Sequence, residues 1–241
     1  MIMKTKVTSS LGFQFIMVLI AIPGSSQTPA TSPQHPMTFF VTSSTTGTGN
    51  LGGLEGADRI CQNLAASVGA GNHIWHAYLS TQSLPFNGNG VEPRVPGVNA
   101  RDRIGTGPWY NQKGVLIATS VEDLHGDIER DSNNIKANTA LTEKGVAVKA
   151  LGAAANAPGY PHDILTGSDS HGRAFSVPGI IDTTCNNWTA DDTAHRTVVG
   201  HADRNGGTNT SWNSAHPTKD CTNAGFIEYG GAGLFYCFAI N

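Results

Sequence analysis

The clearest hydrophobic pattern in the chain is helical and covers residues 54–68. Apolar residues recur there at steps of three and four, which places them on one face of a helix. Glu55 lies in the first turn, where the helix dipole favours a negative charge, and Gly69 follows the last turn, where a helix is commonly capped by glycine. The pattern predicts one main helix near the start of the folded part of the chain.

Short apolar runs rich in aromatic and β-branched residues predict strands. The predicted strands are 37–42, 74–80, 115–118, 198–202 and 233–240. A short helix is predicted at 99–104, and residues 126–160 have no long periodic face and are interpreted as a surface segment with one strand at 145–150. Because helices and strands do not alternate regularly, the predicted class is α+β rather than a parallel α/β sheet.

The first residues have the pattern of a secretory signal peptide. Lys4 and Lys6 precede an apolar run at 11–22, and small residues follow a proline at 23–26. The apolar run is short for a membrane span, although the lack of a clean A-x-A site leaves a retained anchor as the alternative. We expect a signal peptide at 1–26, a polar linker at 27–36 and a single domain at 37–241, in a protein that is secreted, at the cell surface or periplasmic.

Charge and composition narrow the class of partner. Only 14% of the 241 residues are charged, and the formal net charge is −3 before the two lysines of the signal peptide are removed. This mild acidity argues against nucleic acid, heparin or anionic lipid as a main partner. Glycine, asparagine, threonine and serine are plentiful, which is typical of a loop-rich extracellular domain.

The chain has four cysteines, and no two of them have C-x-x-C spacing. That spacing argues against a zinc ribbon or a thioredoxin-type site. An even number of cysteines in an exported chain predicts two structural disulfides. Three pairings are open, and spacing alone does not choose among them.

Several motifs stand in a fixed order among these cysteines. They are L-G-G-L-E-G-A-D-R-I-C-Q (51–62), W-H-A-Y-L-S (75–80), G-S-D-S-H-G-R (167–173), G-H-A-D-R (200–204) and S-W-N-S-A-H-P (211–217). Together with Trp188 after Cys185 and a Y-C-F-A run around Cys237, the chain resembles endostatin-like domains of the C-type lectin-like superfamily and secreted bacterial lectin-like proteins. The resemblance covers most of residues 39–241.

The resemblance implies a C-type lectin-like/endostatin-like α+β fold with a mixed antiparallel sheet, one main N-terminal helix and long loops. It also implies the disulfides Cys61–Cys237 and Cys185–Cys221. The function it implies is non-catalytic binding outside the cell, with glycans as the leading ligand. A protein-binding adhesin or matrix module is the first alternative, and a metal-dependent hydrolase is the second.

Calcium-dependent members of the superfamily use an E-P-N or Q-P-D motif and a later W-N-D motif. Here the chain has W-N-S at 212–214, so Ser214 replaces a carboxylate that calcium would use. The E-P-R at 92–94 precedes Cys185 and does not fit the expected order. A different calcium site could use Asp191, Asp192, Asp203 and Asn205, and the alternative is that these are turn residues.

The candidate ligand-binding residues combine aromatic rings with polar side chains, as sugar-binding pockets do. They are Trp188, Asp203, Arg204, Trp212 and Asn213. For Trp188 the alternative is packing on the nearby disulfide.

Histidines gather in the second half of the chain, several of them beside aspartates. The candidate metal ligands are His171, His201 and Asp203, without the H-E-x-x-H spacing of a helical zinc site. The alternative is that they are solvated loop histidines, so calcium and zinc both stay open as cofactors. Because there is no G-x-S-x-G, Walker A or Rossmann motif, we do not expect an enzyme.

Overall fold

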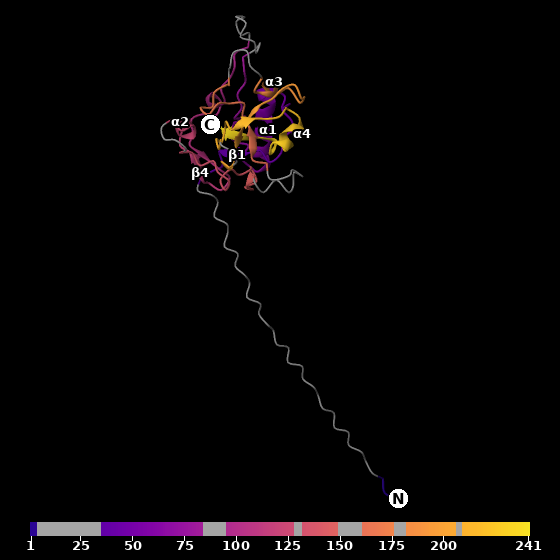
Figure 1. Ribbon diagram of the computed structural model, residues 1–241. Coiled ribbons are helices and arrows are strands. Elements are labelled where there is room, and N and C mark those ends of the chain that lie inside the picture. The colour runs from indigo at the N-terminus through magenta and orange to yellow at the C-terminus, as the bar shows by residue number, and fades with distance from the viewer. Residues whose placement is uncertain (4–34, 84–94, 128–131, 149–160, 176–181, 206–208) are drawn as a thin grey trace, which may run out of the picture. The chain divides into compact units, whose positions relative to one another are not determined.

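The computed structural model describes residues 1–3, 35–83, 95–127, 132–148, 161–175, 182–205 and 209–241 (Figure 1). The chain divides into two compact units, Met1–Ser32 and Pro33–Asn241, and most of the first unit, including all but three residues of the predicted signal peptide, lies outside these ranges. Within them, no helix combines the length and the apolar character that crossing a bilayer requires. The helices and strands of the described residues all belong to the second unit.

The predicted main helix is confirmed as α1 (Gly53–Ser67). Its buried face includes Ala57, Cys61 and Ala65, which are four residues apart, as the periodicity predicted. Gly69 has a left-handed φ of 83°, and its amide donates to the carbonyl of Ala66, which ends the helix.

The main sheet is mixed and is built around one long strand. Its strands are β1 (Phe39–Val41), β2 (Trp75–Ala77), β5 (Asp163–Leu165), β6 (Val198–His201), β7 (His216–Pro217) and β8 (Gly231–Ala239). They follow the order β1-β8-β5-β6-β7, and β2 also pairs with β8. β8 is antiparallel to β1 and β2 but parallel to β5, so the predicted α+β class with a mixed sheet is confirmed.

Strand β8 is apolar along its length because both of its faces are buried. Phe235, Cys237 and Ala239 pack in one hydrophobic cluster together with α1. The alternate residues Tyr236 and Phe238 pack in a second cluster, which contains Trp109 from the smaller sheet. The two clusters therefore lie on opposite faces of the strand, as the two-residue period of β structure requires.

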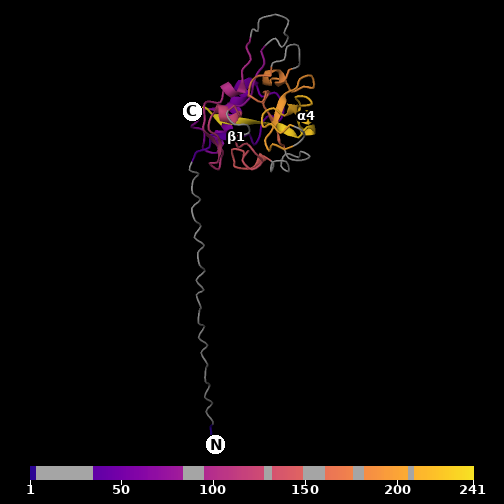
Figure 2. The same cartoon turned by 60° about the vertical axis from the view of Figure 1, so that its left-hand side comes forward.

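The smaller elements surround this sheet. They are η1 (Ala100–Asp102), β3 (Trp109–Tyr110), β4 (Leu116–Ala118), α2 (Val121–Leu124), α3 (Cys185–Trp188) and α4 (Asn223–Glu228). In Figure 1, α1, α3 and α4 lie on one side of the folded unit and α2 with β4 on the other. Figure 2 shows α4 and most of the orange segments on one side of the unit and the C-terminus on the other.

Two predictions for the middle of the chain are wrong. Ile135, Ala140 and Leu141 are buried, so residues 132–148 are not a surface segment. The predicted strand at 145–150 is also absent from its described part, because only Ala147 forms a bridge, to Leu141. The burial of this segment could not be predicted from its sequence, because its apolar residues are scattered along loops and form no periodic pattern.

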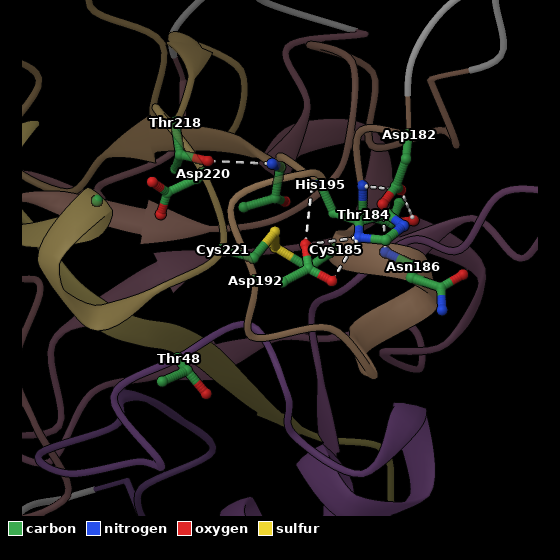
Figure 3. The surroundings of a disulfide bond; sticks show 12 residues. Thr48, Asp182, Thr184, Cys185, Asn186, Asp192, His195, Thr218, Asp220 and Cys221 are labelled. Carbon is green, nitrogen blue, oxygen red and sulfur yellow. Dashed lines mark hydrogen bonds and ion pairs between the residues drawn. A yellow bond between two sulfur atoms is a disulfide. The ribbon is translucent and has the colours of Figure 1, made fainter.

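Two disulfides join distant parts of the unit. Cys61–Cys237 links α1 to β8 with the Cα atoms 5.7 Å apart, and Cys185–Cys221 closes the second link with a Cα distance of 5.8 Å. This is the pairing that the resemblance implied. Around the second disulfide (Figure 3), all four residues of α3 have positive φ, and the side chain of Asp182 accepts hydrogen bonds from the amides of Thr184 and Asn186.

Candidate functional site

A mostly polar pocket with a volume of about 690 Å³ lies among the described residues. Its floor is formed by the buried side chains of His125, Trp212 and Asn213. Its rim includes His171 and Phe175, both exposed. The pocket therefore has a buried floor and an accessible edge.

A chain of hydrogen bonds fixes the floor. His125 Nδ1 lies 2.7 Å from the Val121 carbonyl, which only accepts, so Nδ1 carries the proton and Nε2 is the acceptor. The Tyr78 hydroxyl therefore donates to Nε2 at 2.7 Å and accepts from Asn213 Nδ2 at 3.0 Å. Asn213 Oδ1 accepts from the Ser211 hydroxyl, so both polar atoms of this amide are satisfied.

Burial sets the protonation states of this floor. Loss of hydration lowers the pKa of His125 to about 4, and it raises the pKa of Tyr78 above its usual range. Both side chains are consequently neutral near pH 7. The neutral floor, with its polar atoms bonded within the protein, presents a shape to a ligand but no charge.

The charged groups around the pocket are already engaged. Arg204 donates to the carbonyl of Ile135 at 2.8 Å and to Asn133 Oδ1 at 2.7 Å. Asp169 Oδ1 accepts from two backbone amides of its own loop. On the rim, His171 contacts Asp127, whose pKa is lowered mainly by a hydrogen bond from Arg101.

The predicted ligand-binding residues fall into three places. Arg204, Trp212 and Asn213 line the pocket, and Ser214 lines it beside them. Trp188 lies in the core and donates from Nε1 to the Ser80 carbonyl at 2.8 Å. Ligand binding by these residues stays a prediction, and the E-P-R at 92–94 lies outside the described residues.

Asp203 lies beside a second site, a cluster of histidines around another aspartate. We call it the His–Asp cluster, and it consists of His162, Asp163, His201 and His216. Asp163 and His201 face each other across the antiparallel pair β5–β6, and their side chains share one face of the sheet. His216 pairs with Val199, two residues before His201, which places it on that same face.

Backbone hydrogen bonds hold the cluster in place. The amides of His162 and Asp163 both donate to the carbonyl of Gly230, next to β8, at 3.0 and 3.2 Å. The amide of His201 donates to the carbonyl of Ser211 at 2.8 Å. Asp203 contacts His162 Nδ1 at 3.1 Å from the turn after β6.

The predicted metal ligands are only partly brought together. His201 is in the cluster and Asp203 is beside it, whereas His171 lies on the pocket rim with Asp127. Within the described residues, the one group of three or more metal-ligating side chains is His162, Asp163 and His201, so Asp191 and Asp192 do not form another. In the sequence, the adjacent pair His162-Asp163 was the feature that could indicate this cluster. No sequence feature indicated His216, because its place in the cluster depends on strand pairing.

Comparison with known proteins finds no family model and no curated protein that matches this chain.

Proposed function

We propose that the protein is a secreted or cell-surface binding protein of C-type lectin-like fold that holds a neutral glycan in the polar pocket without catalysing a reaction. The observation that carries the proposal is an exposed aromatic ring, Phe175, in a pocket that hydroxyl and amide side chains such as Ser170, Asn209 and Thr210 also line. Phe175 is 38% exposed although it is strongly apolar. A sugar ring offers an apolar C–H face to such a ring and hydroxyls to the polar groups around it.

The electrostatics of the pocket favour a neutral ligand. Arg204 and Asp169 already donate or accept several hydrogen bonds within the protein, and the floor of the pocket carries no charge near pH 7. An anionic ligand would have to draw Arg204 away from Asn133 and from the Ile135 carbonyl. A polyhydroxy ligand adds hydrogen bonds without breaking these.

The proposed location outside the cytosol is supported by the two disulfides, since such bonds persist in oxidising compartments. Calcium is not required by this proposal. Ser214 lines the pocket where the W-N-D motif would place a carboxylate, and calcium needs several charged oxygens.

A glycan array followed by calorimetric titration in calcium-free buffer tests the proposal. We expect binding of neutral oligosaccharides, and a roughly tenfold loss of affinity in Phe175→Ala, as removal of about 1.4 kcal/mol would give. Tyr229→Ala is the matched control, because Tyr229 is another exposed aromatic residue and does not line the pocket.

A blank array with the folded wild-type protein would contradict the glycan proposal. Equal losses of glycan affinity in Phe175→Ala and Tyr229→Ala would contradict binding in the pocket, because the effect would then not depend on the pocket rim. Binding that appears only after calcium is added would contradict the calcium-free site.

A further inference from the structure

Two histidines of the His–Asp cluster contact one oxygen of Asp163, and the third histidine contacts the other oxygen. His162 Nε2 and His201 Nε2 each lie 3.4 Å from Asp163 Oδ1, and His216 Nε2 lies 3.5 Å from Asp163 Oδ2. The ligand atoms of His162, Asp163 and His201 all lie within 4.8 Å of one another. These contacts involve no hydrogen bond to either oxygen of Asp163.

The spacing of these atoms fits a tetrahedral metal ion. Zinc binds histidine nitrogen and carboxylate oxygen at about 2.0–2.2 Å, so two ligands at tetrahedral corners are about 3.3–3.6 Å apart. The two distances to Asp163 Oδ1, both 3.4 Å, lie in that range, and so does the 3.5 Å from His216 Nε2 to Asp163 Oδ2. They are too long for hydrogen bonds of normal strength.

The outer nitrogens of two histidines fix which nitrogen faces Asp163. His216 Nδ1 lies 3.0 Å from the Pro217 carbonyl, which only accepts, so Nδ1 carries the proton. His162 Nδ1 lies 3.1 Å from a carboxylate oxygen of Asp203, the usual outer partner of a metal-bound histidine. In the neutral rings, Nε2, the nitrogen that contacts Asp163, therefore carries the lone pair that would bind a cation.

Burial makes the arrangement costly without an ion. Asp163 is 1% exposed and His201 is 3% exposed, and no hydrogen-bond partner reaches either oxygen of Asp163 or either ring nitrogen of His201. Buried polar groups are normally paired or bound to metals, because removing them from water is unfavourable. His162 and His216 are partly exposed and give an ion a way in from solvent.

We propose that His162, Asp163, His201 and His216 bind a zinc ion that joins β5, β6 and β7, with Asp203 orienting His162. His162, Asp163 and His201 have ligand atoms close to one another, and His216 beside the other oxygen of Asp163 would complete a tetrahedral shell. An ion with four protein ligands has a structural role and no open position for a substrate. The three strands contain only three, four and two residues, and the ion links them at the end of the sheet. This site is separate from the polar pocket and does not depend on the proposed glycan function.

Zinc titration of the chelator-treated full chain tests the site. We expect one tightly bound zinc per chain by elemental analysis, a higher melting temperature with zinc, and the intense visible absorption of tetrahedral cobalt when Co²⁺ replaces it. His216→Ala should weaken zinc binding by at least roughly a hundredfold, and Asp203→Asn by about 10–100-fold. His195→Ala is the matched control, since His195 pairs with Asp192 outside the cluster.

His216 is partly exposed, so His216→Ala is the variant best placed to keep the fold, and it should bind glycans as the wild type does. The site is disproved if the wild type binds less than one zinc per ten chains. It is equally disproved if His216→Ala and Asp203→Asn bind zinc as tightly as His195→Ala, or if calcium raises the melting temperature more than zinc does. Loss of zinc with intact glycan binding supports two independent sites.

Discussion

Two histidines, one under the polar pocket and one in the His–Asp cluster, are both buried but differ in the hydrogen bonds that their ring nitrogens form. His125 and His201 are 9% and 3% exposed, and burial lowers the pKa of each to about 4. Both ring nitrogens of His125 are bonded, to Val121 and Tyr78. Neither ring nitrogen of His201 has a hydrogen bond.

The difference separates a structural histidine from a candidate ligand. Each partner of His125 completes a network that includes Tyr78 and Asn213, so this histidine needs nothing from outside the chain. His201 instead faces Asp163, which also lacks hydrogen bonds to its carboxylate oxygens. Burial and a lowered pKa are thus shared by both kinds of histidine, and only the inventory of partners distinguishes them.

The largest expected effect is on His201 when zinc is present. His201→Phe should reduce the free energy of unfolding by about 4 kcal/mol at a zinc concentration a thousand times the dissociation constant, because that stabilisation depends on binding. With chelator the same variant should change stability little, since an apolar ring removes two unsatisfied nitrogens from the core. Urea unfolding with and without zinc measures both values, and an equal loss under the two conditions would contradict the comparison.

The next effect is the pH dependence that His125 confers. Its pKa is lower in the folded protein than the usual 6.5, so the folded state binds fewer protons than the unfolded state. The stability that the neutral His125 contributes is fully present above pH 6.5. It falls by about 3 kcal/mol as the pH drops from 6.5 through about 4. The measurement is the difference between wild type and His125→Phe in urea unfolding from pH 7.5 to 4, with chelator throughout.

Subtracting the two curves leaves the contribution of His125, because the His–Asp cluster is unchanged in both proteins. We expect the stability advantage of the wild type to shrink or reverse toward pH 4. A difference that is independent of pH would show that His125 is not held neutral by burial.

The smallest expected effect is that of His125→Phe at pH 7.5. This variant should lower the free energy of unfolding by about 2 kcal/mol, because the buried Tyr78 hydroxyl and the Val121 carbonyl each lose a hydrogen-bond partner. The double variant with Tyr78→Phe should recover part of this loss, since the hydroxyl is then absent as well. Additive losses in this double-mutant cycle would mean that the Tyr78–His125 hydrogen bond contributes nothing.

The comparison also shows why the two sites differed in how far they could be predicted. Trp212 and Asn213 were singled out by their motif, and they do line the pocket, but as its buried floor. The exposed ring at Phe175 was missed, because one aromatic residue in a polar loop has no pattern. Likewise β5 was missed, since three residues are too few for a two-residue period to stand out.

The sequence by itself determined the elements with strong local patterns. The amphipathic period at 54–68 and the apolar run at 233–240 correspond to α1 and β8, and the four cysteines indicated two disulfides. These features depend on neighbours within one turn of helix or along one strand, so local residue types suffice.

Only the tertiary structure decided the partners across the chain. His162 and Asp163 meet His201 and His216 because β5, β6 and β7 pair in one register, and a shift by one residue would turn each side chain to the other face. The burial of Ile135 and Leu141 likewise depends on contacts far away in sequence. Register and burial arise from packing between segments, and no single segment carries that information.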